Sequence, residues 1–433
     1  HLDEAAGATT TAAEATAALP AILGADGPRR YLLLLGSPAE ARDLGGHIGN
    51  WAELTAVDGK LDVVRVGEPY ELFSPASALR PQLSGDLDLP SSLTEMDPTR
   101  FPQNWGASPD LATVARLASD LYPQTPGGAP IDGVMYADPT AFAALLELTG
   151  PVEADGQTLS ADNAVQFLTK DQYQTSNGGD ERSVTPLVRA ALDRFTESPL
   201  PGPSRIASVF GPVVDAGHLQ FVLNGSRGGD LLRRTKLDQP LIAPTGGDLV
   251  AVINRNANPS KIDSYLHRTI DYLIAWDPAS GKTTSRVIVT MRNDAPASGV
   301  STLVNGSAFV MAPATNRTEL SILSPLVAVG AMLDGKQHPY GTRDDVHDLR
   351  RYSLVVDLPP GGERTVILDL EGEIDPGPTY HLAWYNQPLP NRDASRVVLD
   401  PVGATLPGGG DRGSVKVGSD RVEHLAIEVE VEK

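Results

Sequence analysis

The chain has 433 residues, more than one typical domain holds, so we expect two or three domains. Its formal charge of −20 and the lack of a basic patch exclude nucleic acid as an expected partner. Without cysteine, the chain has no disulfide framework, thiolate metal site or cysteine nucleophile. No segment is long and apolar enough to be expected to span a membrane.

Residues 1–28 are rich in Ala and Thr and predict a linker with a short helix near Ala12–Ala18. Because no signal-like segment opens the chain, we expect that a secretion signal or membrane anchor preceded this linker. A frayed terminus is the alternative.

A predicted α/β domain covers residues 29–245, and its first strand is the apolar run Tyr31–Leu35. The run does not alternate, which predicts a strand buried on both faces and ended by Gly36-Ser37-Pro38. Two further strands, Ile48–Ala56 and Leu61–Val66, flank a hairpin turn at Asp58-Gly59.

Charged residues follow the predicted end of the first strand: Glu40, Arg42 and Asp43, before the glycine pair Gly45-Gly46. Ligands of open α/β sheets lie just past the carboxyl ends of strands, so we expect these charges to face a site. A surface loop with solvated charges is the alternative.

The rest of this domain mixes helices with one further strand. Residues 76–104 are polar and interrupted by prolines, which predicts a long loop that could act as a lid. Helices are predicted at Asp110–Tyr122 with Ser108 as N-cap, at Thr140–Leu148 with Asp138 as N-cap, and at Ala164–Thr169, Thr185–Phe195 and Pro212–Val222, with a strand at Ile131–Tyr136. This alternation predicts the α/β class.

Residues 246–433 predict a β-sandwich domain, because short strand-like runs alternate there with turn signals. The predicted strands are Leu249–Ile253, Thr269–Trp276, Ser285–Met291, Glu319–Leu323, Tyr352–Asp357, Arg364–Leu370, His381–Tyr385 and Val422–Val431. In the same region, Asn254, Asn256, Asn258 and Asp263 form a polar cluster that either binds a cation or caps turns.

Several short motifs occur in an order that resembles a bacterial envelope family called domain of unknown function 4012. They are Glu40-Ala-Arg42, Gly45-Gly46-His-Ile-Gly49, Ile131-Asp-Gly-Val134, Leu148-Thr-Gly-Pro-Val152, Ala161-Asp-Asn-Ala-Val165, Asn254-Arg-Asn256, Lys261-Ile-Asp-Ser-Tyr265, Asn293-Asp-Ala-Pro296, Pro359-Pro-Gly361 and Gln387-Pro-Leu389. The resemblance covers roughly residues 29–400.

That family is distantly similar to the LytR–CpsA–Psr phosphotransferases, which move lipid-pyrophosphate-linked glycans onto the cell wall. The resemblance implies an α/β/α sandwich with a central mixed sheet. Pro69-Tyr70-Glu71, Lys170-Asp171-Gln172 and Asp180-Glu181-Arg182 stand near the arginine motifs of those enzymes.

The chain departs from that pattern in its arginines. Tyr70 and Gln172 replace expected arginines, although a pyrophosphate needs several guanidinium groups. Carboxylates are numerous instead, and glycoside cleavage needs two of them, one acid and one nucleophile or base. The alternative is that these carboxylates are simply solvated.

We therefore expect Glu40 to be the nucleophile, kept ionised by Arg42, with Glu71 or Asp171 as the partner acid. The predicted substrate-binding residues are Arg42, Asp43, His47, Trp105, Lys170, Tyr173, Asp180 and Arg182. Aromatic rings among them could stack on sugars, although an aromatic residue is more often part of a core. No metal-ligand spacing is present, so no metal site is predicted.

The resemblance and an Ala-, Gly- and Arg-rich composition typical of a high-GC bacterium imply an extracytoplasmic enzyme that cleaves or transfers glycosidic bonds in a cell-wall polysaccharide. Arabinan of arabinogalactan is the expected substrate, with no cofactor. The first alternative is a phosphotransferase with Mg²⁺ at Glu40 or Asp43 and pyrophosphate at Arg42 and Arg182. The second is a non-catalytic protein that binds wall glycan.

Overall fold

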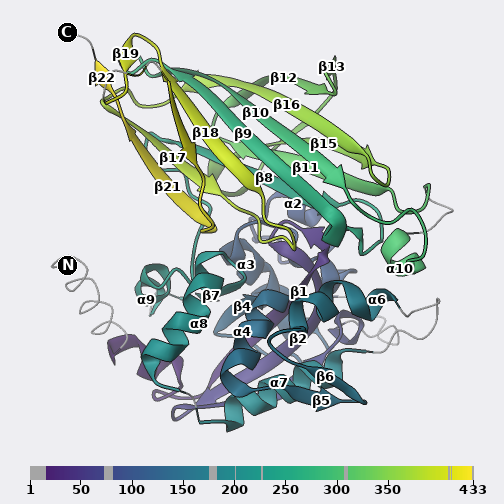
Figure 1. Ribbon diagram of the computed structural model, residues 1–433. Helices are drawn as coiled ribbons and strands as arrows, with labels where there is room; N and C mark the ends of the chain where they lie inside the picture. Colours follow the sequence, from purple (N-terminus) through teal and green to yellow (C-terminus); the bar gives the residue numbers. More distant parts are fainter. Residues whose placement is uncertain are drawn as a thin grey trace. The chain divides into compact units, whose positions relative to one another are not determined.

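The computed structural model describes residues 16–72, 81–174, 183–199, 201–225, 228–306, 311–407, 410 and 412–431 (Figure 1). The chain divides into two compact units. The first comprises His1–Pro38, Leu44–Gln172 and Asp180–Pro240. The second comprises Leu241–Lys433 with two short segments from the first half of the chain, Ala39–Asp43 and Tyr173–Gly179.

The first unit contains a five-stranded mixed sheet in the order β3-β2-β1-β4-β7. Its strands are β1 (Arg29–Arg42), β2 (Gly45–Val57), β3 (Lys60–Gly67), β4 (Gly133–Ala137) and β7 (Leu219–Leu223). Strands β1 and β4 are parallel, whereas β2 pairs with β3 and β4 pairs with β7 in antiparallel fashion. A small hairpin adds β5 (Val152–Ala154) and β6 (Gln157–Leu159).

Helices pack against both faces of this sheet, because both faces of β1 are apolar. Tyr31, Leu33 and Leu35 pack with residues of α4, α7 and α8, whereas Leu32 and Leu34 pack with α3 on the opposite face. The described helices between β3 and Asp248 are α2 (Ser91–Thr94), α3 (Leu111–Leu121), α4 (Pro139–Thr149), α5 (Ala164–Gln166), α6 (Gln172–Gln174), α7 (Thr185–Glu197), α8 (Pro203–Asp215) and α9 (Gly229–Arg234), of which α6 crosses the boundary between the two units. This confirms the expected α/β/α arrangement with a mixed central sheet.

Strand β1 is longer than predicted. It continues through Gly36-Ser37-Pro38 to Arg42, so the prediction that these residues end it is wrong. Pairing with β4 stops at Leu35, and a proline beyond that point removes no hydrogen bond from this ladder. Glu40 and Arg42 therefore lie on a strand and not on a loop.

Two helix boundaries also differ from the prediction. Asp110, not Ser108, caps α3, and its carboxylate accepts a hydrogen bond from the backbone N–H of Thr113 at 2.8 Å. The predicted helix at Pro212–Val222 is wrong, because α8 ends at Asp215 and the apolar run that follows forms β7.

At the start of the described chain, residues 16–22 are helical, and Ile22 is buried in the core.

The second unit is built from two sheets that share one core. The first has the order β13-β12-β16-β10-β9-β18-β20, the second β14-β15-β11-β8-β17-β21. Tyr272 and Val287 of one sheet pack in the same buried cluster as Val250 and Trp384 of the other. This confirms the sandwich, whose long strands are the green to yellow arrows of Figure 1.

Every strand predicted in this region is present, and the structure adds β12, β13, β14, β18, β19 and β20. The strands are β8 (Asp248–Asn256), β9 (Leu266–Trp276), β10 (Lys282–Asn293), β11 (Asn316–Ser324), β12 (Val327–Leu333), β13 (Lys336–Gln337), β14 (Gly341–Asp344), β15 (Arg350–Leu358), β16 (Glu363–Glu373), β17 (Thr379–Tyr385), β18 (Ala394–Pro401), β20 (Gly413–Lys416) and β21 (Val422–Glu428). Helix α10 (Thr302–Asn305) and the short pair β19 (Ala404–Thr405) and β22 (Glu430–Val431) complete the unit.

Candidate functional site

Glu40 lies near the end of β1, in the segment Ala39–Asp43 that belongs to the second unit. Its Oε1 accepts a hydrogen bond from Arg42 Nη2 at 2.8 Å, and its Oε2 accepts one from Lys261 Nζ at 2.7 Å. The side chains of Glu40 and Lys261 are each 12% exposed. Two cations within hydrogen-bond distance stabilise the ionised form of a carboxylate in such a partly desolvated place.

The backbone explains why these groups meet. Residues two apart on a strand share a face, which puts Arg42 beside Glu40. Lys261 comes from the loop between β8 and the 3₁₀ turn Ile262–Tyr265. Its ammonium also lies 5.8 Å from the centre of the Tyr173 ring, so Tyr173 flanks the same group of charges.

Asp263 holds this strand end in place. One carboxylate oxygen accepts hydrogen bonds from the backbone N–H of Ala41 at 2.8 Å and from Asn256 at 2.7 Å. The other accepts from the amides of Asn316 at 2.9 Å and Asn254 at 3.3 Å. Burial raises the pKa of Asp263, and these donors partly offset the shift. Because both oxygens are occupied, Asp263 positions Glu40 and does not itself face a ligand.

The remaining members of the predicted asparagine cluster support the turn interpretation. Asn256 Oδ1 accepts a hydrogen bond from the backbone N–H of Asn258 at 2.8 Å, which is a local turn contact. The amides of Asn254 and Asn256 point their donors at Asp263.

Asp43 is fully buried in a network of charges. It accepts hydrogen bonds from Arg255 at 2.7 and 2.8 Å and from Arg351 at 2.6 Å, and Arg351 also pairs with Asp345 at 2.5 Å. Burial alone would raise the pKa of Asp43, but the two guanidinium groups outweigh it and hold the pKa at about 2. The prediction that Asp43 contacts substrate is corrected by this burial, since its oxygens face only protein groups.

Glu71 and Asp171, the predicted partner acids, belong to the first unit. Both are exposed. Glu71 accepts a hydrogen bond from the backbone N–H of Glu68 at 2.8 Å, and Asp171, at the end of a π-helical turn, accepts one from Gln166 at 2.9 Å. The pairing of either residue with Glu40 stays a prediction.

The other predicted binding residues have different surroundings. Trp105 is 1% exposed, and its indole N–H donates to the carbonyl of Pro98, so it is a core residue and leaves no ring face for a sugar. Tyr173 is also buried, against Ala39 and Val304. His47 on β2 and Lys170 are half-buried. Asp180 and Arg182 lie outside the described residues.

Sequence reasoning did not single out two groups that the structure brings together. Lys261 contacts Glu40, and its only sequence signal was its place in the motif that ends at Tyr265. His218 Nδ1 lies 2.5 Å from Asp138 Oδ2, just past the carboxyl end of β4. No spacing in the sequence could reveal that pair, because β7 brings His218 back from 80 residues away.

Among the described residues, no group of three or more His, Asp or Glu side chains is arranged to hold a metal ion. No helix in the described part of the chain is long and apolar enough to cross a membrane.

Three solved structures show weak likenesses to this chain. A proposed nutrient-binding protein from Legionella pneumophila is 8% identical, with a TM-score of 0.28 over 42% of this chain and 72% of its own. A transcriptional regulator from Bacillus subtilis is 13% identical, with a TM-score of 0.25 over 48% of this chain and 76% of its own. Yeast LTA4 hydrolase in complex with bestatin is 7% identical, with a TM-score of 0.22 over 38% of this chain and 28% of its own. All three scores are too low to carry a conclusion about fold or function.

A search of curated proteins found no match. The likeness to the LytR–CpsA–Psr phosphotransferases is not confirmed by these comparisons. Residues 26–173 match the family model described as "Protein of unknown function (DUF4012)". The matched segment contains the Glu40, Gly45-Gly46, Ile131 and Leu148 motifs, so over these residues the chain is similar to the family that the motifs predicted.

Proposed function

We propose that this protein cleaves or transfers glycosidic bonds in a neutral cell-wall polysaccharide, with Glu40 as the nucleophile or stabilising carboxylate. Arabinan is the substrate that the family resemblance favours. The proposal includes an extracytoplasmic location and requires no cofactor.

One observation supports the proposal more than any other: Glu40 is a largely buried carboxylate that accepts hydrogen bonds from both Arg42 and Lys261. A carboxylate held ionised is what the nucleophilic or stabilising role in glycoside chemistry requires. Asp263 supports that role because it fixes the backbone N–H of Ala41, next to Glu40. The second carboxylate remains a prediction, Glu71 or Asp171.

A phosphotransferase is the second candidate, because two cations adjoin a single carboxylate. Arg42 and Lys261 both donate to Glu40, and cations placed together in this way are also suited to an anionic group such as a phosphate. That reaction would need a lipid-pyrophosphate donor and Mg²⁺.

The deciding experiment is incubation of the full chain with purified arabinogalactan, with and without EDTA, followed by mass spectrometry of the products. We expect shorter or rearranged oligosaccharides in both conditions. Glu40→Gln should lower the rate by roughly 10²–10⁴-fold, the usual contribution of one catalytic proton-transfer or carboxylate group. Asp357→Asn, which alters an exposed Arg–Asp pair, is the matched control and should keep full activity.

Full activity of Glu40→Gln would remove the proposed nucleophile. If no product forms in either tube, but a polyprenyl-pyrophosphate glycan and Mg²⁺ yield transfer that Arg42→Met abolishes, the second candidate is correct. Thermal unfolding of each variant separates loss of activity from loss of fold.

A further inference from the structure

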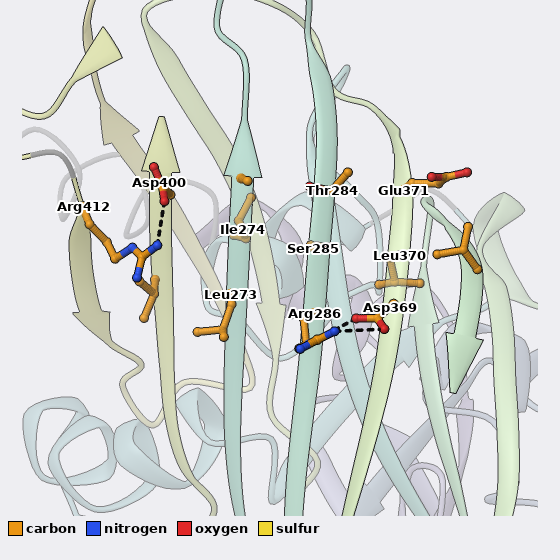
Figure 2. A pocket seen from close by; sticks show the side chains of 13 residues that line it. Leu273, Ile274, Thr284, Ser285, Arg286, Asp369, Leu370, Glu371, Asp400 and Arg412 are labelled. Carbon is orange, nitrogen blue, oxygen red and sulfur yellow. Dashed lines mark hydrogen bonds and ion pairs between the residues drawn. The ribbon is translucent and has the colours of Figure 1, made fainter. Parts of the chain in front are cut away.

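The outward face of the seven-stranded sheet carries a cavity of about 510 Å³. Strands β9, β10, β12, β16 and β18 contribute to its lining, together with Arg412 next to β20 (Figure 2). It shares no residue with the Glu40 group. The strand pairing sets its layout, because Val398, Leu273, Arg286 and Asp369 are consecutive partners across four strands.

Two ion pairs stand on opposite sides of this cavity. Arg286 holds Asp369 through two hydrogen bonds, at 2.6 and 3.1 Å, and Arg412 donates to Asp400 at 2.7 Å (Figure 2). Strand β9 runs between the two pairs, so strand spacing separates them by ~10 Å. Each pair presents its remaining N–H groups and carboxylate lone pairs to solvent in a fixed orientation.

Charge defines which ligand fits. Two cationic side chains, Arg286 and Arg412, and three anionic ones, Asp369, Glu371 and Asp400, line the cavity, so its net charge is −1, whereas that of the whole chain is −20. A nearly neutral surface that offers donors and acceptors side by side favours a neutral ligand whose hydroxyl groups both donate and accept. Anionic and strongly cationic ligands gain nothing from pairs that already neutralise each other.

The apolar part of the lining is aliphatic. Leu273, Val329 and Val398 lie between and beside the pairs, and Val329 is 53% exposed. None of the described residues that line the cavity is aromatic, so recognition by them relies on hydrogen bonds and on contact with C–H groups, without ring stacking.

We propose that this face of the sheet is a binding site for a neutral polysaccharide, which lies across β9 with its hydroxyl groups on the Arg286–Asp369 and Arg412–Asp400 pairs. The inference deepens the proposed function, since it assigns the sandwich to holding the polymer on which the enzyme acts. It rests on that function only for the choice of polymer.

The test is gel electrophoresis of the full chain through soluble arabinogalactan, with polygalacturonate as an anionic polymer in a parallel gel. We expect arabinogalactan to retard the wild type and polygalacturonate not to. Arg286→Leu with Asp369→Leu removes one pair without changing the net charge and should weaken binding about tenfold, as expected for lost charge-assisted hydrogen bonds. Val398→Trp fills the cavity and should do the same.

The matched control is Arg317→Leu with Asp357→Leu, an exposed bidentate pair between β11 and β15 of the other sheet, with both distances at 2.7 Å. It should leave retardation unchanged. Equal retardation of both double variants would overturn the inference, and so would a wild type that no neutral polymer retards. If Val398→Trp instead dissociates a dimer in sedimentation, the face binds a second copy and the inference is wrong.

Glu40→Gln keeps the two proposals apart. It should bind arabinogalactan as the wild type does. Retardation without any cleavage by the wild type leaves this inference standing and removes the proposed function. Cleavage without retardation would support the proposed function and overturn this inference.

Discussion

Arginine–aspartate pairs occur in the second unit in two settings that differ in burial and not in distance. Arg255 and Arg351 hold Asp43 at 2.7 and 2.6 Å with side chains no more than 4% exposed. Arg317 holds Asp357 at 2.7 Å, but these side chains are 38% and 47% exposed. A buried charge that loses its partner is left without solvent, whereas an exposed one is rehydrated at once. The buried Asp43 network therefore stabilises the fold. Exposed pairs such as Arg317–Asp357 remain accessible to a ligand.

The largest expected effect comes from breaking the buried network. Arg351→Met leaves both Asp43 and Asp345 short of a partner, and we expect the free energy of unfolding to fall by about 3–5 kcal/mol. Urea denaturation at neutral pH measures this. A loss no greater than that for Arg317→Met, the exposed counterpart, would contradict the comparison.

Acid should weaken the same network. The pKa of Asp43 is about 2 in the folded protein against an ordinary value of 3.8, so the folded state favours the charged form. This contributes stability that is present above pH 4 and is lost as the pH falls toward 2. The advantage of the wild type over Asp43→Asn should shrink by about 2 kcal/mol across that range. A difference that stays constant from pH 5 to 2 would show that Asp43 keeps its ordinary pKa.

An effect of opposite sign is expected at Asp248 in the sandwich core. Burial raises its pKa, while the hydroxyl groups of Tyr272 and Tyr380, which donate to it at 2.5 and 2.7 Å, offset part of that shift. The folded state then binds the proton more readily than the unfolded state, so lowering the pH from 7 to 4, toward the ordinary carboxyl pKa of 3.8, should stabilise the wild type relative to Asp248→Asn. Denaturation curves of both proteins at the two pH values measure the change, and a relative loss of stability would contradict it.

The smallest effect belongs to the exposed pair. Arg317→Leu with Asp357→Leu should change the free energy of unfolding by less than about 1 kcal/mol, because solvent screens the pair and both side chains regain freedom. The same urea titration applies. A loss as large as that for Arg351→Met would mean that burial does not distinguish the two settings.

Local sequence signals predicted the end of a helix or strand correctly where one or two residues determine that end. Asp138 with Pro139 begins α4, as predicted, and Gly150, at φ 85°, ends it. The hairpin at Asp58-Gly59 also forms where these residues favour left-handed backbone, at φ 49° and 84°. The strands of the sandwich were predicted from short strand-like runs that turn signals separate.

Local signals failed where the structure of a segment depends on pairing with a strand that is distant in the sequence. Pro38 does not end β1, because the β4 ladder has already stopped at Leu35. The run after Asp215 is strand because β4 pairs with it. Of the predicted site, the proximity of Glu40 and Arg42 was correct, but the sequence did not reveal that Lys261 completes the group.

The sequence by itself determined the α/β and sandwich architecture and the resemblance of residues 26–173 to the DUF4012 family model, because periodicity, caps and motif order are local properties. Tertiary structure decided what the charges do. Asp43 and Glu40 stand three residues apart and look alike in the sequence, yet one lies between two buried arginines and the other lies beside a lysine that is still partly open to solvent. Burial and the choice of partner separate them, and both depend on contacts with residues more than 200 positions away.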